Sequence, residues 1–579
     1  MRFFPALIFA LFAASAAQAF THDPVKVENG MAVTSQHLAS DVGVEILKQG
    51  GNAIDAAVAV GYALAVTNPC CGNLGGGGFA TLHLKDGRDI FLNFREKAPL
   101  AATPDMFLDA KGQVIENLSL QGYKAVAVPG TVMGLDALLT RYGSLPRAII
   151  MAPAIRLASE GFVLTEGDAN ILNGSAKDFP ADATAFLHNG SVWKAGDRLT
   201  QPALARTLQA ISDGGTDAFY KGRIADEIVA ASATHGGVLS TDDFRKYSVE
   251  ELPPVTCSYR GFVVVSAPPP SSGGTTLCEI LNILEGYPIA QYGFHSAQSV
   301  HVMVEAMRHA FVDRNFLLGD PDFVANPLER LMSKDYAAQI RAKIDPLKAS
   351  TSMEVQPGTP PHEGTETTHY SVIDKAGNAV AVTYTINALF GAKVIAGDTG
   401  FFLNDEMDDF TIKPGAANLF GLVQGKRNAI QPGKRPLSSM SPTIVKKDGK
   451  VFMVLGSPGG SRIISIVLQV ILDVVDHGMT IQEAVDAPRL HHQWLPDQIT
   501  VEPFTLSADT QHVLEGMGYK IAEQSPWGAA ESLLVGPAAG DADTAQSSGN
   551  DAAALSPTLP GVFYGGHDDR RPAGSAAGF

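Results

Sequence analysis

A pair of threonines after a polar loop has the chemistry of a nucleophile. Thr367 and Thr368 directly follow Glu366 and open a stretch that alternates as a strand does. A threonine hydroxyl is a weak nucleophile unless a base such as the chain's own α-amine lies beside it. An internal threonine has no free α-amine. If Thr367 is the nucleophile, the bond between Glu366 and Thr367 must therefore be cleaved first, which yields two subunits from one gene.

A turn centred on Ala376 predicts what lies opposite this threonine. A hairpin with that centre pairs Thr367 with Thr385, and their Cβ atoms would then be about 5 Å apart. A β-bulge would shift the register. For an arbitrary pair of threonines, cross-strand packing is the usual explanation. The polar loop before Thr367, together with the family resemblance given below, favours catalysis, with Thr385 hydrogen-bonded to the nucleophile and tuning it.

Two adjacent glycines are candidate donors to a developing oxyanion. Gly459 and Gly460 lie between a predicted strand, Val451 to Leu455, and a predicted helix that begins at Arg462. A turn from strand to helix presents backbone N–H groups at the helix N-terminus, and acyl transfer needs such donors. A phosphate-binding loop is the alternative, but the Gly-Lys-Ser/Thr of that motif is missing.

The composition and the N-terminal residues limit the classes to which this protein can belong. The net charge of −17 over 579 residues gives a nucleic-acid role no electrostatic support. Residues 1–19 combine Arg2, an apolar run and an Ala17-Gln18-Ala19 cleavage signal, which is typical of a secretory signal peptide. We expect a secreted or periplasmic protein without a membrane anchor.

The four cysteines allow disulfides in such a compartment. Adjacent Cys70 and Cys71 are strained partners for each other, and a bond between Cys257 and Cys278 is one open possibility. The sequence favours buried thiols over both.

No metal site is predicted. His301, Glu305 and His309 share one helix face, but a polar face explains them more simply than a metal.

Capping and turn signals place these residues on elements. They predict helices over 35–50, from Asn52 onward and over 462–477, with hairpins at Asp86-Gly87 and around 447–449. Residues 538–558 are poor in aromatics and rich in Ala, Ser, Asp and Gly, which predicts a disordered insertion between two strands.

A series of motifs spanning roughly residues 30 to 535 resembles the γ-glutamyltranspeptidases (glutathione hydrolases), a family of N-terminal-nucleophile hydrolases. The resemblance implies a four-layer αββα sandwich, a large subunit 20–366, a small subunit 367–579 and no cofactor. The motifs are Gly72 to Phe79, Phe94-Arg95-Glu96, Leu318 to Phe323, Thr367 to Asn387, Asn404 to Phe410, Lys434 to Thr443 and Gly456 to Arg462.

The resemblance also implies a clamp for the amino-acid end of a γ-glutamyl donor. Its α-carboxylate would be bound by Arg95 with the hydroxyls of Ser438 and Ser439, since arginine suits bidentate carboxylate capture. Its α-ammonium would be bound by Asn387, Glu406 and Asp409. Residues 413–428 resemble the family's lid loop, with Phe420 where many bacterial members have Tyr.

These features predict an enzyme that cleaves the γ-glutamyl amide of glutathione through an acyl-enzyme ester. The acyl group then passes to water or to an amino-acid or peptide acceptor. One alternative is a cephalosporin-type acylase of the same fold, which Asp409 argues against because a glutaryl group has no ammonium. The other is a non-enzymatic periplasmic binding protein.

Overall fold

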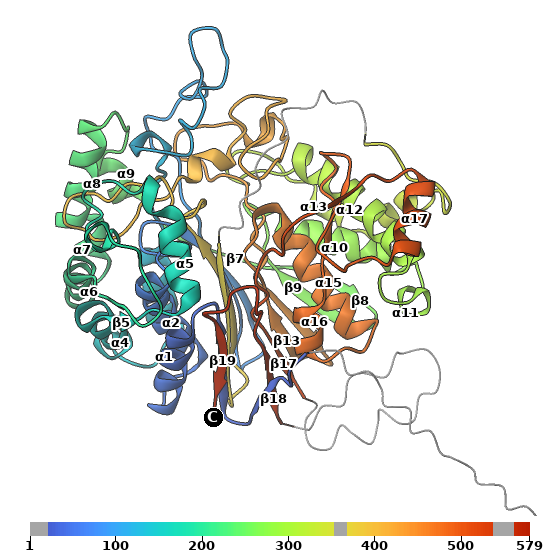
Figure 1. Ribbon diagram of the computed structural model, residues 1–579, viewed down its shortest axis with the longest axis horizontal. Coiled ribbons are helices and arrows are strands. Elements are labelled where there is room, and N and C mark those ends of the chain that lie inside the picture. Colours follow the sequence, from blue (N-terminus) through green and yellow to red (C-terminus); the bar gives the residue numbers. More distant parts are fainter. Residues whose placement is uncertain (1–20, 353–366, 537–560) are drawn as a thin grey trace, which may run out of the picture.

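Two antiparallel sheets stacked face to face form the centre of the molecule, and helices cover both outer faces (Figure 1). The computed structural model describes residues 21–352, 367–536 and 561–579. This layering is the αββα sandwich expected from the resemblance. The predicted signal peptide, Glu366 and the predicted insertion 538–558 lie outside the described residues.

The first sheet holds the predicted nucleophile near its middle. Its seven strands are, in spatial order, β19 (Ser575–Gly578), β2 (Gly30–Thr34), β10 (Thr368–Asp374), β11 (Ala379–Thr385), β3 (Gly77–His83), β4 (Asp89–Phe94) and β7 (Glu250–Leu252).

The second sheet also has seven strands. They are, in spatial order, β1 (Val25–Val27), β18 (Phe563–Gly566), β17 (Ser532–Val535), β13 (Lys450–Leu455), β12 (Thr443–Lys447), β9 (Phe262–Ser266) and β8 (Val255–Tyr259).

Apolar side chains on the facing sides of the sheets form one core layer. Met31, Val33 and Ile373 of the first sheet pack with Ile444 and Val454 of the second, and all are at most 1 % exposed. Larger cores lie outside each sheet, beneath the helices.

The helices fall into two groups that match these outer cores. Over the first sheet lie α1 (His37–Lys48), α2 (Ala53–Thr67), α3 (Thr131–Tyr142) and α4 (Arg147–Glu160), and over the second α10 (Gly273–Leu284), α12 (Ala297–Leu317) and α15 (Ile463–Val475). Shorter elements surround them: α5 (Glu166–Ser175), α6 (Pro202–Gly214), α7 (Thr216–Tyr220), α8 (Arg223–Thr234), α9 (Thr241–Lys246), α11 (Ile289–Tyr292), α13 (Leu328–Leu331), α14 (Lys334–Arg341), α16 (Ile481–Asp486), α17 (Ala508–Met517), the strand pair β5 (Phe162–Val163) and β6 (Arg198–Leu199), and the small sheet of β14 (Leu490–His491), β15 (Ile499–Val501) and β16 (Ile521–Glu523).

The predicted hairpin register is confirmed. Thr368 pairs with Tyr384 and Ile373 pairs with Ala379, so the turn is centred on Ala376 without a bulge. β10 and β11 lie between β2 and β3, which pair with their outer edges. Thr367 therefore stands directly before a strand that is fixed on both sides by hydrogen-bonded neighbours.

The preference for buried thiols is wrong. Cys70 is bonded to Cys71, and Cys257 is bonded to Cys278 with their Cα atoms 5.8 Å apart. The second bond joins β8 to α10, two elements that pack together in space. Sequence spacing alone did not reveal that these elements meet, nor that adjacent cysteines pair in the loop after α2.

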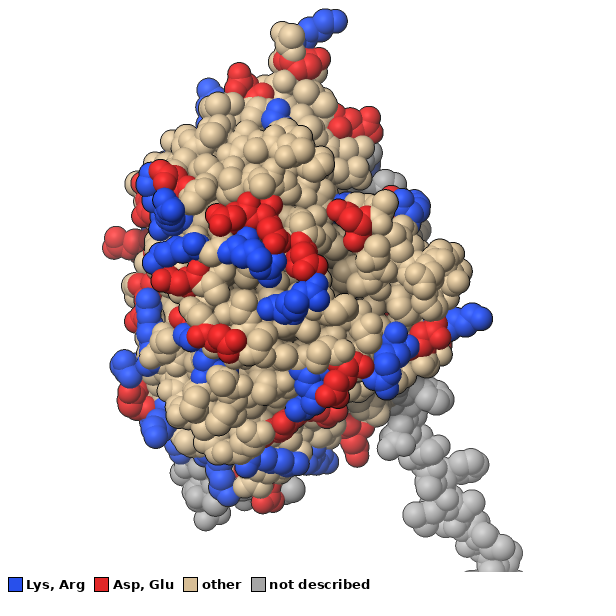
Figure 2. Space-filling view, turned by 90° about the vertical axis from the view of Figure 1, so that its left-hand side faces the viewer, with Lys and Arg blue, Asp and Glu red and all other residues tan. Residues whose placement is uncertain are grey.

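Surface charge is distributed without one dominant sign on the face shown in Figure 2, where acidic and basic side chains are interspersed. Within the described ranges, no helix has the length and apolar character needed to cross a membrane.

Candidate active site

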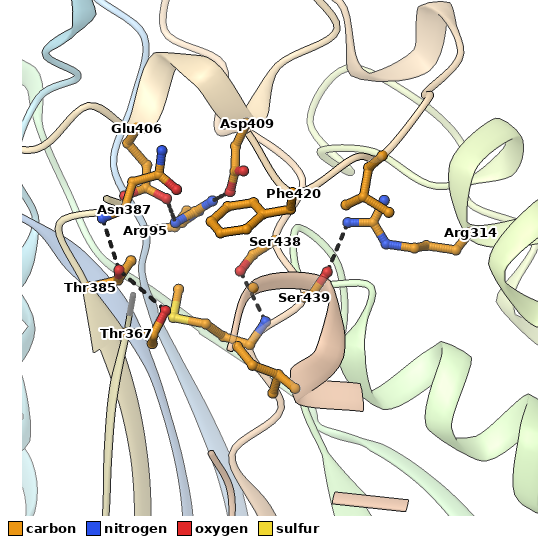
Figure 3. A pocket seen from close by; sticks show the side chains of 14 residues that line it. Arg95, Arg314, Thr367, Thr385, Asn387, Glu406, Asp409, Phe420, Ser438 and Ser439 are labelled. Atoms are coloured by element: carbon orange, nitrogen blue, oxygen red, sulfur yellow. Dashed lines mark hydrogen bonds and ion pairs between the residues drawn. The ribbon is translucent and has the colours of Figure 1, made fainter. Parts of the chain in front are cut away.

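A small pocket at one end of the two sheets contains nearly all the residues singled out from the sequence (Figure 3). Its volume is about 20 Å³, which is room for a single water molecule. The lining residues are Arg95, Arg314, Thr367, Thr385, Asn387, Glu406, Asp409, Phe420, Leu422, Ser438, Ser439, Met440, Gly460 and Ile463.

The two threonines face each other across the start of the hairpin. Thr367 Oγ1 lies 3.4 Å from Thr385 Oγ1, and both residues are at most 5 % exposed. The backbone N–H of Asn387 donates to Thr385 Oγ1 at 2.8 Å, which fixes that hydroxyl beside Thr367. The hairpin register therefore places the two threonine hydroxyls side by side, as predicted.

Arg95 contacts the two carboxylates that were expected to bind the donor's α-ammonium. Its guanidinium is fully buried and forms ion pairs with Glu406 and, at 2.5 Å, with Asp409. The sequence placed these groups in one clamp but did not predict that they pair with each other. The clamp thus neutralises its own charges, because a buried charge needs a partner.

Burial changes the charge that this cluster carries. Desolvation raises the pKa of Glu406 well above its usual range even though Arg95 opposes the shift. Desolvation likewise raises the pKa of the neighbouring Glu96 to about 7, again against the effect of Arg95. Burial thus disfavours the charged forms of Glu406 and Glu96, whereas Arg95 and an incoming ammonium favour them.

Asn387 is oriented by the loop that follows β11. Its φ of 72° is in the left-handed region, which asparagine tolerates better than most residues. Its Nδ2 donates to the backbone oxygen of Asp405 at 3.1 Å. The amide oxygen is thereby assigned the acceptor role that binding an ammonium needs.

Ser438 and Ser439 reach the pocket from the segment before β12. Ser438 Oγ accepts the backbone N–H of Met440 at 3.1 Å, and Ser439 Oγ accepts Arg314 Nη2 at 3.0 Å. Arg314 comes from α12 and is the functional candidate that the sequence analysis missed. An arginine in a long helix has no distinguishing pattern, although it lies four residues before the Leu318 to Phe323 motif.

Phe420, from the segment 413–428, packs closely against the glycine turn. Gly460, with φ of 55°, lines the pocket, and a Cβ there would fall 2.2 Å from the ring of Phe420. Gly459 adopts φ of 135° and lies behind the lining. In the described part of the chain, neither glycine N–H has a hydrogen-bond acceptor, so both remain available to a ligand oxygen.

Among the described residues, no group of three or more His, Cys, Asp and Glu side chains is arranged to hold a metal. His301, which was weighed as a ligand, instead contacts Tyr519 Oη at 2.7 Å and the backbone oxygen of Asp345 at 2.9 Å.

A threonine at the head of a central strand, in two stacked antiparallel sheets between helices, defines the class of N-terminal-nucleophile hydrolases. Comparison with known proteins then narrows the class. The sequence profile described as Gamma-glutamyltranspeptidase matches residues 39–555. The chain belongs to the gamma-glutamyltranspeptidase family, and it is an enzyme.

Individual relatives agree with this placement. The glutathione hydrolase proenzyme of Pseudomonas sp. (strain A14) is 56 % identical over 99 % of this chain and 98 % of that protein. The proenzyme of the same name from Escherichia coli (strain K12) is 48 % identical over 89 % of each chain. The crystal structure of cephalosporin acylase from Bacillus halodurans superposes with a TM-score of 0.81 at 28 % identity, over 99 % of each chain.

Proposed function

We propose that this enzyme is a γ-glutamyltransferase and glutathione hydrolase that uses Thr367 as its nucleophile. One observation carries the proposal. The hydroxyl of Thr367 opens into the same small pocket as a buried arginine, two carboxyls, an asparagine and two serines. That set complements an α-amino-acid zwitterion, which is the part that γ-glutamyl donors share.

The chemistry follows from the positions of these groups. The α-amine of Thr367 takes the proton from its own Oγ, which attacks the γ-carbonyl. The N–H groups of Gly459 and Gly460 stabilise the oxyanion. The tetrahedral intermediate expels the donor's amine, which takes up the proton, and leaves a γ-glutamyl ester on Thr367. Water or the amine of an acceptor peptide then attacks the ester, the bond between Thr367 Oγ and the acyl carbon breaks, and the proton lost by the attacking group returns to Thr367 Oγ through the α-amine.

The nucleophile's α-amine requires cleavage between Glu366 and Thr367. We propose that the chain cuts itself there, giving subunits 20–366 and 367–579 that stay together as a heterodimer. The word "proenzyme" in the names of the two relatives supports a processed product.

We also propose that the protein is secreted. Removal of residues 1–19 would release the protein into the periplasm or the medium, where the two disulfides are stable.

The acylase alternative differs in the charge of the substrate that the pocket would bind. A glutaryl group would leave the buried Asp409 with no ammonium to bind. This favours γ-glutamyl donors.

Denaturing electrophoresis with N-terminal sequencing tests the cleavage. Wild type is expected to give two fragments, the smaller beginning at Thr367, and Thr367→Ala is expected to remain one chain. Thr368→Ala is the matched control, because this neighbouring side chain is on the opposite strand face and should allow cleavage. A small fragment that begins elsewhere would contradict the proposal.

Kinetics with glutathione, with and without glycylglycine, tests the activity. Release of glutamate alone indicates hydrolysis, and γ-glutamylglycylglycine indicates transfer. A cleaved enzyme that does neither would exclude the proposed substrate class.

A further inference from the structure

Arg314 is a buried arginine on α12 whose guanidinium has no carboxylate partner among the described residues, and a purely structural role in the helix does not explain this. We propose that Arg314 is a positioning residue for the donor's α-carboxylate, supplying the second positive charge of that site through Ser439. The inference rests on the proposed function and adds to it a residue that the sequence analysis did not assign.

The first argument is the balance of charge. Arg95 is matched by Glu406 and Asp409, whereas no carboxylate among the described residues lies within ion-pair distance of Arg314. Arg314 is nevertheless 1 % exposed. Burial lowers its pKa to about 10, with a small opposing effect from Asp409, so it is charged at neutral pH. The hydrogen bonds of Arg314 go to neutral acceptors on Ser272, Asn315, Gln424 and Ser439. A buried charge that has neutral partners only is costly, which indicates that a ligand supplies the anion.

The second argument is the direction of the hydrogen bonds. A guanidinium can only donate. Because Arg314 Nη2 donates to Ser439 Oγ at 3.0 Å, that oxygen is the acceptor and its own proton points elsewhere. Ser438 Oγ is likewise an acceptor, from the N–H of Met440. Both hydroxyls line the pocket and are thus set to donate to one ligand carboxylate.

The third argument is that Arg314 also holds the backbone that carries these serines. Its Nε donates to Ser272 Oγ at 3.0 Å, and Ser272 Oγ donates to the backbone oxygen of Ser438 at 2.6 Å. The N–H of Ser272 donates to the same oxygen at 2.8 Å. One guanidinium therefore fixes both serines, and its positive charge would attract a carboxylate that is bound to their hydroxyls.

Figure 3 shows this arrangement directly. Arg314 approaches Ser439 from the side opposite Arg95, Glu406 and Asp409. A carboxylate in the pocket would thus have a cation on each side, Arg95 in direct contact and Arg314 behind the serine.

The test compares two donors that differ only at the carboxylate. These are γ-glutamyl-p-nitroanilide and its α-carboxamide analogue, and the readout is the ratio of their kcat/KM values. Arg314→Gln keeps an N–H donor for Ser439 but removes the charge. We expect the ratio to fall by about 10- to 100-fold, mostly through the carboxylate donor. Arg314→Lys should restore part of the ratio.

A double-mutant cycle tests the route through Ser439. If Arg314 acts through that hydroxyl, the ratio of the double variant Arg314→Gln/Ser439→Ala should be no lower than that of the more affected single variant. Additive losses would overturn the route. Should the Gln variants fail to mature, the cycle is run with Arg314→Lys, for which we expect a smaller fall of about 3- to 10-fold.

A matched control separates this role from the general loss of a buried arginine. Arg435 is also fully buried, is paired with Glu250 at 2.5 Å and does not line the pocket. Arg435→Gln should lower stability and leave the ratio unchanged. If Arg314→Gln slows both donors equally, Arg314 is structural and the inference fails. If wild type uses neither donor, the proposed function itself fails.

Discussion

At the scale of single residues, Arg95 has two tasks that cannot be separated in the free enzyme. It pairs with Glu406 and Asp409 and is placed to bind a donor carboxylate. Arg95→Ala should lower kcat/KM for a γ-glutamyl anilide by about 10²-fold or more, because a charge-assisted bond to a desolvated carboxylate is lost. Arg95→Lys keeps the charge without the fork and should recover only part. Unchanged kinetics in the alanine variant would mean that another cation binds the donor.

Asp409 sets the choice between γ-glutamyl and glutaryl substrates. Asp409→Asn keeps the shape but removes the charge that an ammonium needs, so γ-glutamyl hydrolysis should fall while glutaryl amides are rejected less. The measurement is the ratio of the two kcat/KM values in wild type and variant. If wild type already prefers the glutaryl amide, or if the ratio does not move towards it in the variant, the ammonium-binding role is wrong.

The extent to which these residues were predictable depends on how local their signal is. Thr385 followed from a turn centre and strand alternation, since a hairpin register is a local property. The pairing of Arg95 with Glu406 and the role of Arg314 were not predictable, because residues more than 100 positions apart meet only through the packing of the whole fold. The two disulfides were missed for related reasons: one joins distant elements, and the other depends on the path of a loop.

At the scale of elements, the β10–β11 hairpin couples maturation to turnover. Thr385→Ala removes the hydroxyl 3.4 Å from Thr367 Oγ1 and the acceptor of the Asn387 N–H. Both self-cleavage and donor turnover should slow, because both use the Thr367 hydroxyl. Time courses of processing and kcat of the processed enzyme measure the two effects. If Thr385→Ala is processed normally and has a normal kcat, the two threonines only pack against each other and Thr385 has no role in catalysis.

A second element, the segment 413–428, is held in place by the carboxyl group of Asp408, which has an unusual pKa. Asp408 accepts hydrogen bonds from Ser119 Oγ at 2.7 Å and from the N–H of Leu419 at 2.8 Å. Burial nevertheless raises its pKa to about 6.

This shift predicts a pH dependence of stability. The native state binds the Asp408 proton more tightly than the unfolded chain, so stability from this group falls as pH rises from about 4 to 6 and is flat above. A shift from 3.8 to about 6 corresponds to about 3 kcal/mol. Between pH 4 and 7, thermal midpoints of wild type should fall relative to Asp408→Asn by a few degrees. A difference that is constant with pH would contradict the assignment.

At the scale of the whole molecule, residues 537–560 connect two strands that pair without them. Val535 pairs with Phe563, and the N–H of Gly536 donates to Val562 O at 2.9 Å. Replacing 538–558 with Asn-Gly should leave processing intact and kcat/KM within about twofold, since shortening the connection between two paired strands changes closure entropy little. Gel analysis, kinetics and thermal melts check this. A tenfold loss of activity would show that the segment reaches the site.

Both sheets combine strands from the two proposed subunits, and this determines whether folding involves one chain or two. Strands from before and after residue 366 are direct neighbours in both sheets: β2 lies between β19 and β10, β11 beside β3, β18 beside β1 and β12 beside β9. The uncut chain folds as one molecule, at a rate independent of dilution. After the proposed cleavage, the same architecture can be regained only by an encounter of two chains. Cleavage thus leaves the native structure almost unchanged but makes refolding depend on the meeting of two chains. A cleaved enzyme that has been denatured should therefore regain little activity after dilution, whereas the uncleaved Thr367→Ala chain should refold well.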